Sequence, residues 1–202
     1  MNKQISNQQK QSFDIICSFL SEQGEIDRAY LYKKYLNGIV WNGIPNPPKT
    51  VNDPVTVFIL EQKIGKSAKE LVKTRKWVNA VEASVGHLLE RYIHHKTANH
   101  GWAWCAGSVV KATDFLKKTN DGWIQIQVKN RDNTENSSSC AIRDGTKIKK
   151  WFRLFSKTGK TNWESLPLLM GENCGMSEDD FFLFVESTVC GSFAHKKSCL
   201  DV

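Results

Sequence analysis

The sequence WIQIQVK at residues 123–129 alternates apolar and polar side chains. This period of two predicts a strand that is buried on one face. Neighbouring side chains of a strand point to opposite faces, so Gln127 and Lys129 lie together on the polar face. The tripeptide Asn120-Asp121-Gly122 predicts a tight turn directly before this strand. Asp114 precedes the turn, which makes it a candidate partner for the Gln-x-Lys pair.

The rest of the chain predicts a small sheet between groups of helices. The apolar run at residues 102–110 is typical of a buried strand, so residues 102–129 are expected to form a hairpin or two adjacent strands. Helices are expected over residues 8–22, 27–37, 55–64, 67–76, 78–95 and 147–155, and in a last segment that starts near residue 177. This order favours an α/β or α+β fold, with a small mixed sheet flanked by helices.

Two of the expected helices depend on specific patterns. Residues 147–155 combine apolar positions at helical spacing with four basic residues, and Trp151 and Phe152 are expected in the core. Ser177, followed three residues later by Asp180, is typical of a capping box at the start of a helix.

A segment rich in Pro, Asn and Gly at residues 38–48 predicts a loop or extended linker. We therefore expect an N-terminal helical segment and linker over residues 1–55. A second domain is expected over residues 56–202, with its functional core at about 80–165.

Composition limits the class of protein. The chain has 202 residues, 40% of them hydrophobic, and no apolar run is long enough to span a bilayer. The polar N-terminus lacks the apolar core of a signal peptide, so a cytoplasmic location is expected. None of the six cysteines forms a C-x-x-C pair, which favours free thiols over a structural zinc site.

The positive charge is concentrated in one part of the chain. The net charge is +7, and residues 111–160 hold twelve Lys and Arg against five acids, which accounts for the whole excess. A localised basic stretch is typical of a protein that binds a polyanion. A solvated basic face is the alternative interpretation of the charge alone.

The residues around the predicted strand suit metal-dependent hydrolysis of a phosphodiester. Asp114 would anchor Mg²⁺, and Gln127 would add an amide oxygen where a carboxylate is more common. Lys129 would polarise the attacking water or neutralise the charge that develops on the phosphate. A surface hairpin whose polar side meets water is the alternative, because the spacing D-x₁₂-Q-x-K also arises by chance.

The predicted helix at residues 78–95 offers a further acid. Glu90 follows a small residue that permits close packing on the sheet, and it lies at the edge of the apolar stripe. Glu82 lies nearer the centre of the stripe, so the sequence leaves both open. His94 and His95, at the end of this helix, are expected at the surface.

The polar segment after the strand predicts a DNA-binding loop, because Asn and Arg read base edges whereas Ser and Lys contact phosphates. The candidate base readers are Arg131, Asn133, Asn136 and Arg143, and Asn130 belongs to the same predicted DNA-binding set. The candidate phosphate contacts are Ser137, Ser138, Lys147 and Lys150.

Several strings in this region resemble the SinI-like type II restriction endonucleases. They are GHLLERYI at 86–93, GWAWCAGSVVKATDF at 101–115, QVKNRDNTENSSS at 127–139, AIRDGT at 141–146, KKWFR at 149–153 and TGKTNW at 158–163. The resemblance is dense over residues 80–165 and looser towards both ends of the chain.

The resemblance implies a PD-(D/E)xK nuclease core, Mg²⁺ dependence and cleavage of double-stranded DNA within a GGWCC-type site. It also implies a companion DNA methyltransferase and a two-fold homodimer. Asp114 and Lys129 take the acid and lysine roles by position. Gln127 stands where the wider superfamily has an acid, and Thr113 stands where it has proline.

Two other functions remain as alternatives. A DNA repair or junction-resolving nuclease would use the same core without a base-reading loop. A sequence-specific DNA-binding protein whose metal site has decayed at Gln127 would bind DNA without cutting it. An RNA-binding module is disfavoured, because the sequence lacks an aromatic-rich strand motif of the RNP type.

Overall fold

The computed structural model describes residues 5–64, 68–133 and 145–197, with side chains through residue 191. Its sheet has four strands in the order β1-β2-β3-β4: Ala103–Trp104, Phe115–Thr119, Gly122–Arg131 and Ile148–Leu154. The first three strands pair antiparallel, and β4 pairs parallel to β3. The predicted α/β fold with a small mixed sheet flanked by helices is therefore confirmed.

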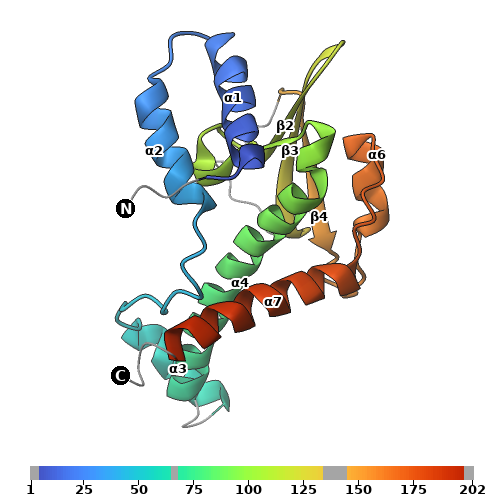
Figure 1. The fold of residues 1–202 in the computed structure, drawn as a ribbon. Coiled ribbons are helices and arrows are strands. Elements are labelled where there is room, and N and C mark those ends of the chain that lie inside the picture. The colour runs from blue at the N-terminus through green and yellow to red at the C-terminus, as the bar shows by residue number, and fades with distance from the viewer. Residues whose placement is uncertain (1–4, 65–67, 134–144, 198–202) are drawn as a thin grey trace. The chain divides into compact units, whose positions relative to one another are not determined.

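Helices precede and follow the sheet along the chain (Figure 1). The α-helices are α1 (Asn7–Ser21), α2 (Arg28–Ile39), α3 (Pro54–Ile64), α4 (Ala68–Thr97), α6 (Leu166–Met170) and α7 (Glu178–Lys197). Short 3₁₀ helices among the described residues are η2 (Ala98–His100), η3 (Ala106–Ser108) and η4 (Trp163–Ser165). The helices expected at 67–76 and 78–95 are parts of one continuous helix, α4.

The chain divides into two compact units. One contains residues 1–41 and 88–202, and the other contains residues 42–87. The first unit holds the sheet, α1, α2, α7 and the last three turns of α4. The domain boundary that the sequence predicts near residue 55 stays a prediction.

Two predictions about the sheet are wrong. The helix expected at residues 147–155 is instead the strand β4, because the backbone there pairs in parallel with β3 from Gln125↔Ile148 to Arg131↔Leu154. The helical spacing of the apolar residues does not outweigh this pairing, which buries Trp151 to 1% exposure in the core, as predicted for that side chain. Phe152 is half-buried.

The run at residues 102–110 is a strand only at Ala103–Trp104. It ends there because Cys105 leaves the extended conformation, with φ −84° and ψ 47°, and the chain continues into η3, where Gly107 and Ser108 adopt positive φ angles of 73° and 53°. The hairpin partner of β3 is instead β2, through the turn predicted at residues 120–122.

A close backbone contact joins α2 to η3. A Cβ atom on Gly38 would lie 2.0 Å from the backbone nitrogen of Gly107. Only glycine therefore allows this approach at position 38. The contact holds α2 against the segment that leads from β1 to β2.

An aromatic cluster links α4, β4, η4 and α7. The ring of Trp163 lies 5.2 Å from that of Trp151 and 5.6 Å from that of Tyr92, and Tyr92 lies 5.3 Å from Phe181. All four residues are buried. This cluster fixes the C-terminal part of α4 relative to the sheet.

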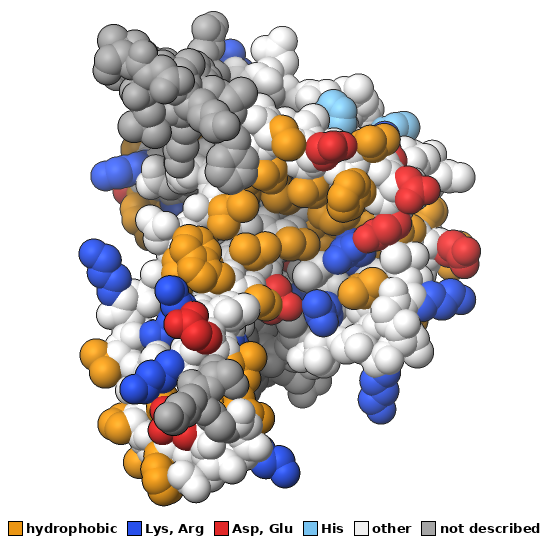
Figure 2. Space-filling view, turned by 90° about the horizontal axis from the view of Figure 1, so that it is seen from below, with side chains coloured by type: hydrophobic (Ala, Val, Ile, Leu, Met, Phe, Trp, Pro, Cys, Tyr) orange, Lys and Arg blue, Asp and Glu red, His pale blue; other side chains and the backbone are white. Residues whose placement is uncertain are grey.

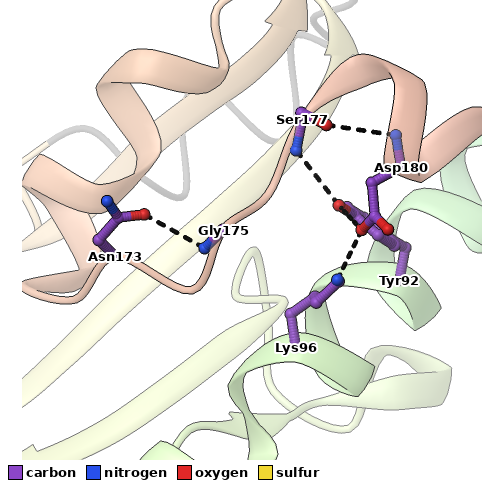
Figure 3. Close-up of polar contacts among 6 residues, drawn as sticks. All are labelled: Tyr92, Lys96, Asn173, Gly175, Ser177 and Asp180. Atoms are coloured by element: carbon purple, nitrogen blue, oxygen red, sulfur yellow. Dashed lines mark hydrogen bonds and ion pairs between the residues drawn. The ribbon is translucent and has the colours of Figure 1, made fainter.

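The start of α7 is anchored to α4 by polar contacts (Figure 3). The backbone N–H of Asp180 donates to Ser177 Oγ at 3.2 Å, which confirms Ser177 as the cap. The Asp180 carboxylate does not return to Ser177 as a capping box would require. It accepts from the Tyr92 hydroxyl at 2.6 Å and pairs with Lys96 at 2.6 Å.

Within the described parts of the chain, the helices are each too short or too polar to cross a membrane.

Candidate active site

Asp114 lies directly before β2 and beside β3. The register pairs Phe115 with Ile126 and does not continue regularly to Asp114. The backbone N–H of Asp114 donates to Ile126 O at 2.9 Å, so Asp114 and Phe115 both lie opposite Ile126, as in a β-bulge. Gln127 and Lys129 share a face of β3, as the alternation in the sequence predicted.

The Asp114 carboxylate is held in place by the backbone. Its Oδ2 accepts a hydrogen bond of 2.7 Å from the N–H of Val128. The chain approaches Asp114 through Ala112, whose φ of 53° is unusual for a residue with a side chain. The segment before β2 is thus shaped to present Asp114 to β3.

Glu90 on α4 supplies a second carboxylate to the same place. Its Oε2 accepts a hydrogen bond of 2.8 Å from Trp104 Nε1. The charges of Asp114 and Lys129 both act on Glu90, and Lys129 also acts on Asp114. Glu90, Asp114 and Lys129 therefore form one electrostatic group.

The sequence left the choice between Glu90 and Glu82 open. Glu82 is exposed, whereas the charge of Asp114 acts on Glu90. Glu90 is therefore the better candidate for the further acid.

Burial and mutual repulsion shape the titration of the two acids. Burial raises the pKa of Glu90 well above its ordinary value, and the Asp114 charge raises it further. Burial also raises the pKa of Asp114, whereas the Val128 N–H and Lys129 lower it. Two buried carboxyls with raised pKa values are a destabilising arrangement that a bound cation would relieve.

Sequence reasoning missed Trp104. It is 1% exposed and lies in a run that predicts only a buried strand, because nothing local shows that its N–H reaches a carboxylate 14 residues away. Lys150 pairs in register with Gln127 and so shares its face. Lys150 was predicted as a phosphate contact on a helix, and strand pairing brings it beside the catalytic candidates instead.

The predicted DNA-binding residues are only partly brought together. Arg131 shares the face of Lys129, at the end of β3. Asn133 is exposed just after β3, and Lys147 is exposed just before β4. Asn130 accepts a hydrogen bond of 3.0 Å from Arg153 Nε, so its oxygen is engaged within the protein. The remaining predicted contacts lie outside the described residues: Asn136, Ser137, Ser138 and Arg143.

Acids from other parts of the chain neutralise some of the basic stretch. Lys118 pairs with Glu22 at 2.8 Å, Lys117 pairs with Glu172, and Arg153 pairs with Glu178. Other lysines of the stretch are exposed: Lys111, Lys147, Lys149, Lys157 and Lys160. These exposed lysines are the better candidates for contacts to a polyanion.

An aspartate directly before one strand and beside a Gln-x-Lys strand, with a glutamate from a neighbouring helix, resembles the sites of PD-(D/E)xK nucleases. Comparison with known proteins agrees: residues 23–190 match the model of the SinI restriction endonuclease family. The chain belongs to this family, which confirms the resemblance seen in the sequence.

Two curated relatives are similar over 148 residues. Type II restriction enzyme SinI of Salmonella infantis is 46% identical, and type II restriction enzyme Eco47I of Escherichia coli is 43% identical. Each match covers 71% of this chain and 64% of the relative. The chain thus matches less than two thirds of the length of either relative.

Proposed function

We propose that this chain is a type II restriction endonuclease that hydrolyses double-stranded DNA with Mg²⁺, within a short GGWCC-type site. The observation that carries the proposal is the convergence of Asp114, Lys129 and Glu90 in a chain of the SinI family. The two restriction enzymes to which the chain is similar support the same activity.

The donor set at this site suits a hard divalent cation. Asp114 and Glu90 offer carboxylate oxygens, and Gln127 offers an amide oxygen, which are the ligand types that Mg²⁺ prefers. Burial raises the pKa of both acids, so a bound cation would stabilise their charged forms. Gln127 has an amide where a carboxylate is more common, so Glu90 would supply the second carboxylate of the site.

The protein contributes position and charge to the proposed reaction. When bound, Mg²⁺ would neutralise charge on the phosphate and lower the pKa of a water molecule. The Val128 N–H and the Trp104 N–H each hold one carboxylate through one oxygen. Lys129 on the same face would orient the attacking water or stabilise the charge that develops on the phosphate.

DNA would approach over the end of β3 and the start of β4. Arg131 would read a base, together with Asn133, Asn136 and Arg143, whereas Lys147 and Lys150 would contact phosphates together with Ser137 and Ser138. The Asn130 oxygen is bound to Arg153, so we propose that Asn130 mainly supports Arg131 by bracing the strand.

The proposed substrate implies two partners. A pseudo-palindromic site favours a two-fold homodimer, with one subunit for each strand. On α7, Phe182 and Leu183 are 68% and 62% exposed, and Figure 2 shows hydrophobic side chains gathered on the face seen from below. An exposed hydrophobic surface of this kind supports a second copy of the chain as the partner.

A companion DNA methyltransferase would protect the same DNA site. A cytoplasmic location follows from this role.

Digestion of unmethylated plasmid DNA with the purified protein, in Mg²⁺ and in chelator, tests the proposal. Sequencing the fragment ends should show Mg²⁺-dependent cuts at one short site of GGWCC type. Cuts without sequence preference would favour the repair nuclease. Intact DNA that still shifts in a gel would favour the DNA-binding protein with a decayed metal site.

A further inference from the structure

We propose that His100, Glu172 and Cys174 form a second metal site, separate from the candidate active site and suited to Zn²⁺. One ligand atom from each residue, a nitrogen, a carboxylate oxygen and a sulfur, lies within 4.8 Å of the other two. Zn²⁺ accepts all three ligand types, whereas Mg²⁺ prefers oxygen alone. Three protein ligands leave a fourth position for water.

The local backbone places two of the ligands on one side of a short loop. Glu172 and Cys174 are half-buried, whereas Gly171, Asn173 and Gly175 between and around them are exposed. The N–H of Gly175 donates to Asn173 Oδ1 at 3.2 Å, and Gly171 and Gly175 have φ angles of 72° and 63° (Figure 3). The loop is therefore bent so that alternate side chains face the protein.

The third ligand comes from a different element. His100 ends η2, and the chain turns there through Gly101, which has a φ of 78°. His100 Nδ1 contacts Glu172 Oε2, while Lys117 on β2 contacts the other oxygen, Oε1. Lys117 thus orients the carboxylate without occupying the oxygen that faces His100. Metal and lysine would share Glu172 through separate oxygens.

Cys174 must lose its proton to bind a metal. Burial and the Glu172 charge raise the pKa of the Cys174 thiol, and Lys117 and Lys96 act in the opposite direction. Binding would therefore release a proton, as is general for thiolate ligands. The predicted absence of zinc rested on the missing C-x-x-C spacing, and this cluster instead joins residues 72 positions apart by tertiary folding.

The site would complete the attachment of the α6–α7 connection to the end of α4. One end of this connection is already held, because Ser177 and Asp180 contact Tyr92 and Lys96 (Figure 3). Metal at His100, Glu172 and Cys174 would hold the other end. We therefore expect the metal to stabilise the folded protein without taking part in phosphodiester hydrolysis.

Cobalt(II) titration of the metal-stripped protein tests the site, because a thiolate–cobalt bond gives a charge-transfer band. An Asp114→Asn background separates it from the candidate active site. The expected result is one Co²⁺ per chain with this band, displaced by Zn²⁺. Cys174→Ser should abolish the band, and His100→Ala should weaken binding at least about ten-fold. Cys190→Ser, an exposed cysteine on α7, is the matched control.

Absence of the band, or its persistence in Cys174→Ser, would overturn the proposal. Circular dichroism of each metal-free variant should match that of the parent protein. His100 is 47% exposed, so His100→Ala should fold normally, and unchanged Co²⁺ affinity in that variant would also overturn the site. The experiment measures Co²⁺ binding and not DNA cleavage. A negative result would therefore leave the proposed nuclease function unaffected.

Discussion

Trp104 donates its indole N–H to Oε2 of Glu90 at 2.8 Å. The tryptophan lies on β1 and the glutamate on α4, so one hydrogen bond joins the edge of the sheet to the helix that faces it. This bond favours the charged form of Glu90 and opposes the effect of burial on its pKa. Trp104 is therefore a positioning residue for the proposed metal site.

Trp104→Phe should keep most of the buried ring and remove the hydrogen bond. A bond to a charged group contributes about 1.5–3 kcal/mol, so the pKa of Glu90 should rise and Mg²⁺ should bind more weakly. We expect slower cleavage at neutral pH, with partial recovery as the pH increases. A pH–rate profile at several Mg²⁺ concentrations measures both effects. A profile that matches the parent enzyme would remove Trp104 from this role.

Glu90→Gln should stabilise the metal-free protein at high pH. The folded state binds the Glu90 proton more tightly than the unfolded chain does, because the folded pKa is raised above 4.5. The stability from this group is thus full below the unfolded pKa and is lost as the pH rises through the folded pKa. In chelator at pH 8, the Tm of Glu90→Gln should exceed that of the parent by at least about 2 °C.

The difference should shrink towards pH 5, and Mg²⁺ should raise the Tm of the parent more than that of the variant. Glu82→Gln is the matched control, since Glu82 is an exposed glutamate on the same helix. Equal Tm values for the parent and Glu90→Gln at pH 8 would contradict the claim that the ionised Glu90 carboxylate destabilises the metal-free folded protein.

Gly38→Ala should destabilise the fold, because the new Cβ would lie 2.0 Å from the backbone of Gly107. Overpacking of this kind costs at least about 1–3 kcal/mol. Gly86→Ala on α4 is the contrasting control, since nothing lies within 4 Å of its Cβ position. That change should be neutral or stabilise the helix by about 0.5–1 kcal/mol. Chemical denaturation of both variants makes the comparison, and similar midpoints would refute the close contact.

Arg131→Ala should lose sequence discrimination, whereas Lys147→Ala should weaken binding to all DNA. The difference follows from their proposed contacts, a base edge for Arg131 and a phosphate for Lys147. Binding to cognate and random duplexes over a range of salt concentrations separates the two effects. Lys147→Ala should reduce the slope of log K against log salt by about 1. A uniform loss for Arg131→Ala would show that it is also a phosphate contact.

Local patterns in the sequence were sufficient for the central strand of the sheet. The alternation at residues 123–129 and the turn at 120–122 follow from neighbouring residues, so β3 and the shared face of Gln127 and Lys129 could be predicted. The cap at Ser177 is equally local.

Features that depend on tertiary packing could not be predicted in this way. The strand β4 owes its form to pairing with β3, not to its own apolar spacing. His94 was expected at the surface, but it is 7% exposed beside Trp104, and burial lowers its pKa to about 4. The interaction of Glu90 with Asp114 likewise depends on how the C-terminal part of α4 packs in the folded chain.

The most direct test of the account is single-turnover cleavage of an unmethylated duplex that contains the recognition site, by Glu90→Gln and Glu82→Gln side by side. We predict that Glu90→Gln loses about 100-fold or more in Mg²⁺-dependent rate, since one carboxylate of the site is gone. Glu82→Gln should cut within about two-fold of the parent rate, as expected for a surface substitution. Full activity of Glu90→Gln, or an equal loss in both variants, would contradict a site built from Asp114, Lys129 and Glu90.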